Sequence, residues 1–200
     1  MDDSTPGRRE RKRQQTADLL AEKALELFEV HGYEAVTMEQ IAAAADVAKG
    51  TLYNYFPVKE ALLRHYFHQQ IAATAPELTA RMKRTPDAIE RIRVLLRHAA
   101  NWSEKHRRYW PHYLQYRIAN LRGSDEERSG LEAVFFRVLG DAQEAGRLRA
   151  DRDIATLVHY FQFLYLGVYT RWLATPGCKL EDEFMTMLDL FLAGAGGNAK

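Results

Sequence analysis

The stretch TMEQIAAAADVAKGTLYNYFPVKEALL, from Thr37 to Leu63, decides the fold of the N-terminal part of this chain. Thr37 has the position of a helix N-cap, and Gln40 stands three residues on, where a capping box places its partner. An apolar stripe at helical spacing follows and ends at Asp46. A second short helix begins near Lys49. Two short helices joined by a tight turn predict a helix-turn-helix that reads duplex DNA.

The candidate DNA contacts gather around the start of the second helix. Val47 and Leu52 can pack this helix against the first, which leaves its N-terminal end free to enter a major groove. The next helix starts near Lys59, whose side chain can contact a phosphate from the same side. We expect bases to be reached by Lys49, Thr51 and Tyr53, and phosphates by Thr37, Tyr55 and Lys59. The full set of DNA-binding candidates is Thr37, Lys49, Gly50, Thr51, Tyr53, Asn54, Tyr55 and Lys59.

These residues closely resemble the DNA-binding domain of the TetR family of bacterial transcriptional regulators. The family pattern runs G-Y, T, two helices, then K-G-T-L-Y-x-Y-F-x-x-K-E-x-L, and the resemblance covers roughly residues 12 to 68. The chain departs from the pattern at Ala48 and Val58, where a capping Ser, or a Ser, Asn or Asp, is usual. Each lost cap costs about 1 kcal/mol. We therefore expect a softer recognition helix, with part of its capping supplied by Asp46 or water.

Length and composition agree with a small intracellular regulator. The chain has 200 residues, 46% of them hydrophobic, and a single cysteine, which cannot form an internal disulfide. No apolar signal segment precedes the basic start, so we expect a cytoplasmic protein. The longest apolar stretch, Ile154 to Ala174, contains His159, Gln162 and Arg171. These polar groups would be expensive in a bilayer core, so we expect no membrane contact.

Helical periodicity continues through the whole chain, and no strand is indicated. We predict an all-α protein of about nine helices: a flexible basic arm at 1–10, a three-helix helix-turn-helix domain at 11–57, and a larger helical ligand-binding and dimerisation domain at 58–200. The linking helix starts near Lys59, and Pro76 is expected to kink or end it. A later helix is expected to start at Gly123 to Asp125. The basic block Arg8 to Arg13 is compatible with a DNA-contacting arm and with a solubilising tail.

The helix over Ile154 to Ala174 is apolar all round, and such a helix is buried all round. One side can meet the core of its own chain, and the other needs a partner. With a helix over Glu181 to Leu192, it would form a four-helix bundle in a two-fold dimer, which the family resemblance also implies. The alternative is a central core helix of a monomer. The candidate interface residues are Tyr160, Phe163, Gly167, Phe184, Leu188 and Phe191.

Aromatic and histidine side chains are frequent on the predicted C-terminal helices. Stripes of this kind are usually core, but a mostly apolar pocket with a few polar anchors is also the usual form of a small-molecule site. The family resemblance implies such a pocket for an effector. The candidate ligand contacts are Trp102, His106, Trp110, Tyr113, Arg117, Phe135, Phe161 and Tyr165.

Positive charge is concentrated between Arg81 and Arg122, a stretch that contains eleven Lys or Arg and only three Asp or Glu. Most of these side chains are expected on a solvated face. A minority near the pocket would favour an anionic effector such as an organic acid or an acyl thioester. No cofactor is expected. His65 and His68 lack a third ligand for a metal, and Cys178 lacks a second thiol.

We therefore predict a homodimeric transcriptional regulator that binds a palindromic operator until a small molecule enters the C-terminal domain. That it represses is implied by the resemblance alone. Two alternatives stay open at this point. One is an enzyme or ligand carrier that uses the aromatic, His-rich cavity, and the other is a constitutive DNA-binding protein with a filled core.

Overall fold

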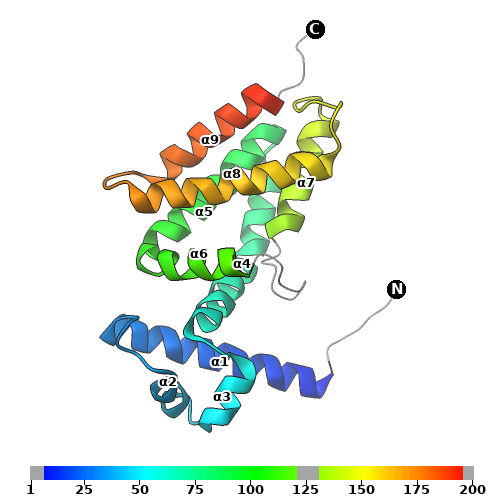
Figure 1. Ribbon diagram of the computed structural model, residues 1–200. Helices are drawn as coiled ribbons and strands as arrows, with labels where there is room; N and C mark the ends of the chain where they lie inside the picture. Colours follow the sequence, from blue (N-terminus) through cyan, green and yellow to red (C-terminus); the bar gives the residue numbers. More distant parts are fainter. Residues whose placement is uncertain (1–6, 121–130, 196–200) are drawn as a thin grey trace. The chain divides into compact units, whose positions relative to one another are not determined.

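The computed structural model describes residues 7–120 and 131–195 of the chain. Over these ranges it contains nine α-helices, one short 3-10 helix and no β-strand (Figure 1). The helices are α1 (Arg8–His31), α2 (Met38–Ala44), α3 (Lys49–Tyr55), α4 (Lys59–Lys83), α5 (Ala88–Lys105), η1 (Arg107–Tyr109), α6 (Trp110–Ala119), α7 (Leu131–Glu144), α8 (Ile154–Ala174) and α9 (Leu180–Ala195). The all-α prediction is confirmed.

The chain divides into two compact units. The N-terminal unit comprises Met1–Ala73 and His112–Leu121, and the C-terminal unit comprises Thr74–Pro111 and Arg122–Lys200. Most of α6 thus belongs with the helix-turn-helix, although it lies far from it in the sequence. The predicted domain boundary at residue 58 stays a prediction.

The N-terminal unit has a small apolar core of its own. Leu20 and Phe28 of α1, Ile41 of α2 and Leu52 of α3 are almost completely buried. Apolar residues at a spacing of three and four place these side chains on one face of each helix. α6 joins this unit through α4, where the rings of Phe67 and Tyr113 lie 4.7 Å apart.

The basic block at the start of the chain is helical where it is described. α1 begins at Arg8, so Arg8, Arg9 and Glu10 extend the helix instead of forming a flexible arm, and this corrects the prediction for these residues. Basic and acidic residues with long side chains are good helix formers, and the backbone hydrogen bonds of α1 continue through them. Residues 1–6 of the predicted arm lie outside the described residues.

Pro76 does not end α4. The helix continues through this proline to Lys83, so of the two expected outcomes, a kink or an end, the end is wrong. Proline removes one backbone donor and crowds the preceding turn, but the hydrogen bonds on either side can carry the helix through. α4 therefore spans the boundary between the two units, which falls between Ala73 and Thr74.

The C-terminal unit is built around four helices. α5, α7, α8 and α9 pack in a closed order, since α5 contacts α7 and α9, and α8 contacts α7 and α9. Aspartate N-caps begin two of them: Asp87 accepts a hydrogen bond from Glu90 N at 2.9 Å, and Asp153 accepts one from Thr156 N at 2.8 Å. The predicted start of α7 at Gly123 to Asp125 lies outside the described residues.

Candidate DNA-binding surface and effector site

α2 begins with the capping box that the sequence predicts. The Thr37 hydroxyl accepts a hydrogen bond from Gln40 N at 3.2 Å, and Thr37 N donates to Gln40 Oε1 at 2.8 Å. Two of the backbone donors at the helix start are satisfied in this way. The bonds fix the start of α2 relative to the loop that precedes it.

The turn between α2 and α3 depends on Asp46. This residue has a φ of 53°, in the left-handed region that is unusual for a side chain other than glycine. Val47 N donates to Ala42 O at 3.0 Å and Asp46 N donates to Ala43 O at 3.2 Å, which is the Schellman pattern at a helix C-terminus. Asp46 thus closes α2, and the expected capping of α3 by its side chain is not among the described hydrogen bonds.

α3 presents its predicted contact face to solvent. Leu52 is fully buried, whereas Lys49, Gly50, Tyr53 and Asn54 are exposed. The helix buries one side and leaves the opposite side free because its few apolar residues lie on one face. Thr51 and Tyr55 are half-buried at the edges. The N-cap Ala48 makes no side-chain capping bond, as expected from the missing Ser.

An acidic residue that sequence reasoning missed lies beside the recognition face. Glu39 of α2 forms an ion pair with Lys49 of α3. A side-chain hydrogen bond from Lys49 lowers the pKa of Glu39, and the same bond raises the pKa of Lys49. The Lys49 ammonium also lies 5.7 Å from the centre of the Tyr53 ring. No sequence signal pointed to this pair, because Glu39 and Lys49 lie ten residues apart on two different helices.

Lys59 has a structural role beside any phosphate contact. Its ammonium donates to the carbonyl of Tyr33 at 2.8 Å and to that of Glu34 at 3.4 Å, and it lies 4.6 Å from the centre of the Tyr33 ring. These bonds tie the start of α4 to the loop between α1 and α2. Burial raises the pKa of Tyr33, and the charges of Glu60 and Glu34 raise it further, so its phenol stays neutral.

A second tie holds α4 to α1. His65 Nε2 lies 2.7 Å from Asp18 Oδ1, and the His65 ring meets the edge of Phe56 with centres 5.3 Å apart. His112, at the start of α6, stacks on Tyr33 with ring centres 3.8 Å apart. The loop before α2 is therefore held from both α4 and α6.

The eight predicted ligand contacts fall in both units. Tyr113 and Arg117 belong to the N-terminal unit, and the other six belong to the C-terminal unit. In the C-terminal unit, Trp102 stacks on His106 with ring centres 4.3 Å apart, and Trp110 stacks on Tyr169 at 3.8 Å. The remaining three form an aromatic cluster in the core: Phe135, Phe161 and Tyr165.

Tyr169 is a buried aromatic that sequence reasoning did not place near the ligand candidates. Its hydroxyl lies 3.0 Å from the hydroxyls of both Ser103 and Tyr165. The chain of hydroxyls satisfies polar groups that would be costly to bury alone. The Glu104 carboxylate also links neighbouring segments, since it accepts hydrogen bonds from Trp172 Nε1 at 3.0 Å and from Leu180 N at 2.9 Å.

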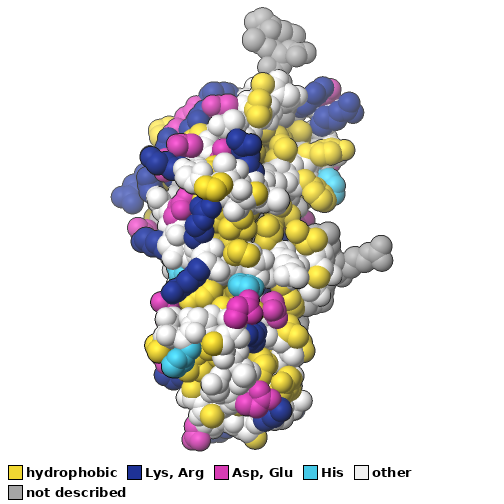
Figure 2. Space-filling model, turned by 60° about the vertical axis from the view of Figure 1, so that its left-hand side comes forward, with side chains coloured by type: hydrophobic (Ala, Val, Ile, Leu, Met, Phe, Trp, Pro, Cys, Tyr) yellow, Lys and Arg dark blue, Asp and Glu magenta, His cyan; other side chains and the backbone are white. Residues whose placement is uncertain are grey.

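The outer face of α8 is apolar and exposed. Tyr160 and Phe163 are 62% and 55% exposed, Gly167 is also exposed, and Leu190 of α9 is 70% exposed. Figure 2 shows a face of the molecule on which hydrophobic side chains lie side by side among charged ones. Leu164, which is 44% exposed, and Leu190 belong to the exposed apolar surface as well, but the sequence analysis did not include them among the interface residues.

Three of the predicted interface residues lie elsewhere. Phe184 and Leu188 are completely buried, and Phe191 is 7% exposed, so these α9 side chains belong to the core of their own unit. This corrects their assignment to the dimer interface. The reason is helical geometry, because residues spaced by three and four share the face that packs on α5 and α8, whereas Leu190 lies on another face.

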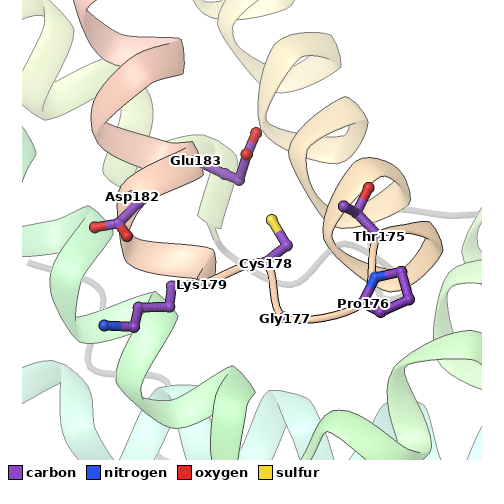
Figure 3. A pocket seen from close by; sticks show the side chains of 7 residues that line it. All are labelled: Thr175, Pro176, Gly177, Cys178, Lys179, Asp182 and Glu183. Atoms are coloured by element: carbon purple, nitrogen blue, oxygen red, sulfur yellow. The ribbon is translucent and has the colours of Figure 1, made fainter.

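A surface pocket of about 390 Å³ lies at the turn between α8 and α9 (Figure 3). In Figure 3 the sulfur of Cys178 points toward Glu183, and burial raises the pKa of this thiol, as does a hydrogen bond with Glu183. The lining is Thr175, Pro176, Gly177, Cys178, Lys179, Asp182 and Glu183, and includes none of the predicted ligand contacts. No helix within the described ranges is both long and apolar enough to cross a membrane.

The predicted DNA-contacting residues of α3 lie within the part of the chain that matches a known protein family. The family described as bacterial regulatory proteins, tetR family, matches residues 20–66. The regulator TcmR of Streptomyces glaucescens is 49% identical over 55 residues, which are 28% of this chain and 24% of TcmR. The repressor KstR of Rhodococcus jostii is 37% identical over 79 residues, 38% of this chain and 35% of KstR. The matched stretch thus spans about a third of these relatives or less.

A solved structure is similar over nearly the whole chain. The crystal structure of Thermus thermophilus FadR, a TetR family transcriptional repressor, in complex with lauroyl-CoA has a TM-score of 0.78 and 29% sequence identity. The similarity covers 92% of this chain and 98% of that one. It therefore includes the C-terminal helices, for which the sequence motifs provide no match.

Proposed function

Because this chain belongs to the TetR family of bacterial regulatory proteins, we propose that it is a ligand-responsive repressor that binds a palindromic operator as a dimer. One observation carries the proposal: the exposed face of α3 presents Lys49, Tyr53 and Asn54 on a helix whose other face is buried. A major groove admits a helix of this kind, and side chains near its N-terminus reach base edges.

The dimer is supported by the apolar surface of α8. Tyr160, Phe163 and Gly167 share one exposed face, and Leu164 and Leu190 extend it. Contiguous exposed apolar side chains mark association surfaces. A two-fold arrangement of α8 and α9 would cover this face and present two copies of α3 to two half-sites.

The effector is proposed to be a small molecule with an apolar body and an anionic group. Support comes from the similarity to FadR of Thermus thermophilus, whose structure holds lauroyl-CoA. The aromatic side chains of the C-terminal unit supply apolar surface of the required kind. Release from DNA by a hundredfold would need about 2.7 kcal/mol of differential effector binding between the two states. The site of action is proposed to be the cytoplasm.

In vitro selection from random duplex DNA tests the function. The wild-type chain should enrich a two-fold symmetric sequence, and Lys49→Ala should relax the base preference at one position of each half-site. Lys23→Ala on α1 is the matched control, because it removes the same charge away from α3. Enrichment of no sequence by the wild-type protein would argue against a regulator and in favour of an enzyme or carrier.

A further inference from the structure

The helix-turn-helix stretch carries little positive charge for a surface that binds DNA. Between Thr37 and Leu63 two cations stand against three anions, a net charge of −1: Lys49 and Lys59 against Glu39, Asp46 and Glu60. Affinity for DNA of arbitrary sequence comes mainly from cations that neutralise phosphates. This stretch therefore adds little sequence-independent affinity, and its contribution to binding depends on contacts with base edges.

The two lysines of this stretch are both held by groups of the same unit. The Lys59 ammonium donates to the carbonyls of Tyr33 and Glu34 at 2.8 and 3.4 Å. Lys49 forms an ion pair with Glu39, although both side chains are more than half exposed. Lys59 thus ties α4 to the neighbouring loop, whereas Lys49 lies beside a carboxylate on the face that is predicted to meet bases.

Glu39 and Lys49 lie on two helices that are packed against each other. The capping box fixes the first turn of α2, where Glu39 lies. The hydrogen bond from Val47 N to Ala42 O at 3.0 Å closes the turn that joins α2 to α3. The Lys49 ammonium also lies 5.7 Å from the centre of the Tyr53 ring, about one helical turn further along the exposed face of α3. A carboxylate and an ammonium are therefore presented side by side at the start of the recognition helix.

The stability of α3 does not account for a lysine at its first position. The N-terminal end of a helix carries partial positive charge, which disfavours a cation. The first turn of α3 contains no acidic residue, and its N-cap Ala48 makes no side-chain hydrogen bond. Lys49 therefore costs α3 some stability, and the Glu39 carboxylate offsets part of that cost. The pair is better explained by what it binds than by what it stabilises.

The major-groove edge of a G·C pair presents the complementary groups. Guanine has two acceptors, N7 and O6, and the N4 amino group of the paired cytosine is a donor that lies beside O6. A lysine ammonium carries three donors, and a carboxylate only accepts. An ammonium and a carboxylate side by side therefore match the acceptors and the donor of one G·C pair.

We propose that Lys49 and Glu39 together read one G·C pair in each half-site, with Lys49 donating to guanine O6 or N7 and Glu39 accepting from cytosine N4. The proposal rests on the proposed function and deepens it, because it names a base pair of the operator and adds Glu39 as a specificity-determining residue. When the ion pair opens on a G·C pair, both side chains find a new partner. On a mismatched pair, a charge faces a like group, and this repulsion rejects the wrong sequence.

The proposal sets an order for the four base pairs at this position. T·A offers thymine O4 and adenine N6 in the same places as G·C, but it has a methyl group where guanine has N7, so one donor contact is lost. C·G and A·T place an amino group against the ammonium and a carbonyl oxygen against the carboxylate. These two pairs should bind about fivefold to a hundredfold more weakly than G·C, the usual range of discrimination for a base contact of this kind.

Selection from random duplex DNA, followed by titration of the selected operator and its single base-pair variants, tests this order. Glu39→Gln should relax the preference at the G·C position, because an amide both donates and accepts, and Lys49→Ala should relax it at the same position. A merely structural role of Glu39 would change the affinity for all four base pairs alike. Glu26→Gln is the matched control, because it removes one carboxylate from the exposed pair with Lys23, and it should leave the preference intact.

A charge-swapped protein provides a second test. Glu39→Lys combined with Lys49→Glu keeps the net charge, and it should shift the preferred pair from G·C toward C·G; circular dichroism checks that it is folded. An unchanged G·C preference in Glu39→Gln or in the swapped protein, or relaxation at two different positions by the two single variants, would overturn the proposal. If wild type still selects a two-fold operator in that case, the proposed function stands. Selection of no sequence by wild type would count against both.

Discussion

Glu39 lies on α2 beside the predicted contact face of α3, and its negative charge opposes DNA binding. Its ion pair with Lys49 must open before Lys49 can reach a base, and its carboxylate would then face a phosphate-rich groove. Glu39→Gln should therefore tighten operator binding about twofold to fivefold at low salt, since exposed ion pairs are weak. Mobility-shift titration measures the change. Glu26→Gln, which breaks the exposed pair with Lys23, should leave affinity unchanged, and weaker binding by Glu39→Gln would contradict this role.

Asp46 occupies a backbone conformation that glycine adopts without strain. With φ at 53°, replacement by glycine should relieve steric crowding that costs L-residues of the order of 1–2 kcal/mol. Asp46→Gly should raise the free energy of unfolding by about 0.5–1 kcal/mol, because added chain entropy in the unfolded state offsets part of the gain. Urea denaturation measures it. Gly32→Ala, where φ is 84°, should have the opposite sign.

His68 makes stability depend on pH. Its folded pKa of about 3 lies below the ordinary value of 6.5, so the unfolded chain binds the proton more readily. Stability is therefore complete above pH 6.5 and falls as the pH is lowered toward 3. His68→Gln should flatten the fall between pH 6.5 and 5, where one proton contributes at most about 1.4 kcal/mol per pH unit. Thermal melts of both proteins over this range would show the difference, and parallel curves would argue against it.

At the scale of elements, the position of α4 depends on the contacts of its first turn. Val58 provides no side-chain cap, and Lys59 compensates by binding the carbonyls of Tyr33 and Glu34. Lys59→Met keeps the apolar stem and removes both hydrogen bonds. It should lower the free energy of unfolding by about 1 kcal/mol, since the ammonium is half-exposed.

Operator affinity separates the two possible roles of Lys59. If the side chain acts only by positioning α4, the operator affinities of wild type and Lys59→Met should fall with salt concentration at the same slope. If it also contacts a phosphate, the salt slope should fall by about one in the variant. Unchanged stability and unchanged affinity together would contradict both roles.

At the scale of the molecule, Gly167 provides a test of the proposed dimer. A Cβ built at this position meets no described atom within 4 Å, so a side chain can begin there without a clash. Gly167→Arg should place unpaired charge in the interface and convert dimers into monomers with at least tenfold weaker operator binding. Sedimentation measures the mass. Phe136→Asp on exposed α7 is the control, and a dimeric Gly167→Arg would place the interface elsewhere.

Local chemistry explains why much of this protein was predictable from its sequence. The capping box at Thr37, the end of α3 after Tyr55, the missing cap at Ala48 and the burial of Leu52 depend on residues within a few positions of one another. Periodicity over longer stretches predicts the all-α class for the same reason, because spacing by three and four is a property of single helices. The DNA contacts, the dimer and the effector stay predictions.

The tertiary structure decided what depends on residues far apart in the chain. Which face of α9 is covered follows from packing against α5 and α8, so Phe184, Leu188 and Phe191 are core while Leu190 is exposed. The sequence pattern alone cannot distinguish two apolar faces of one helix. The ion pair of Glu39 with Lys49 likewise requires the fold. Electrostatic contacts of this kind depend on distance in space, which sequence spacing specifies only within a helix.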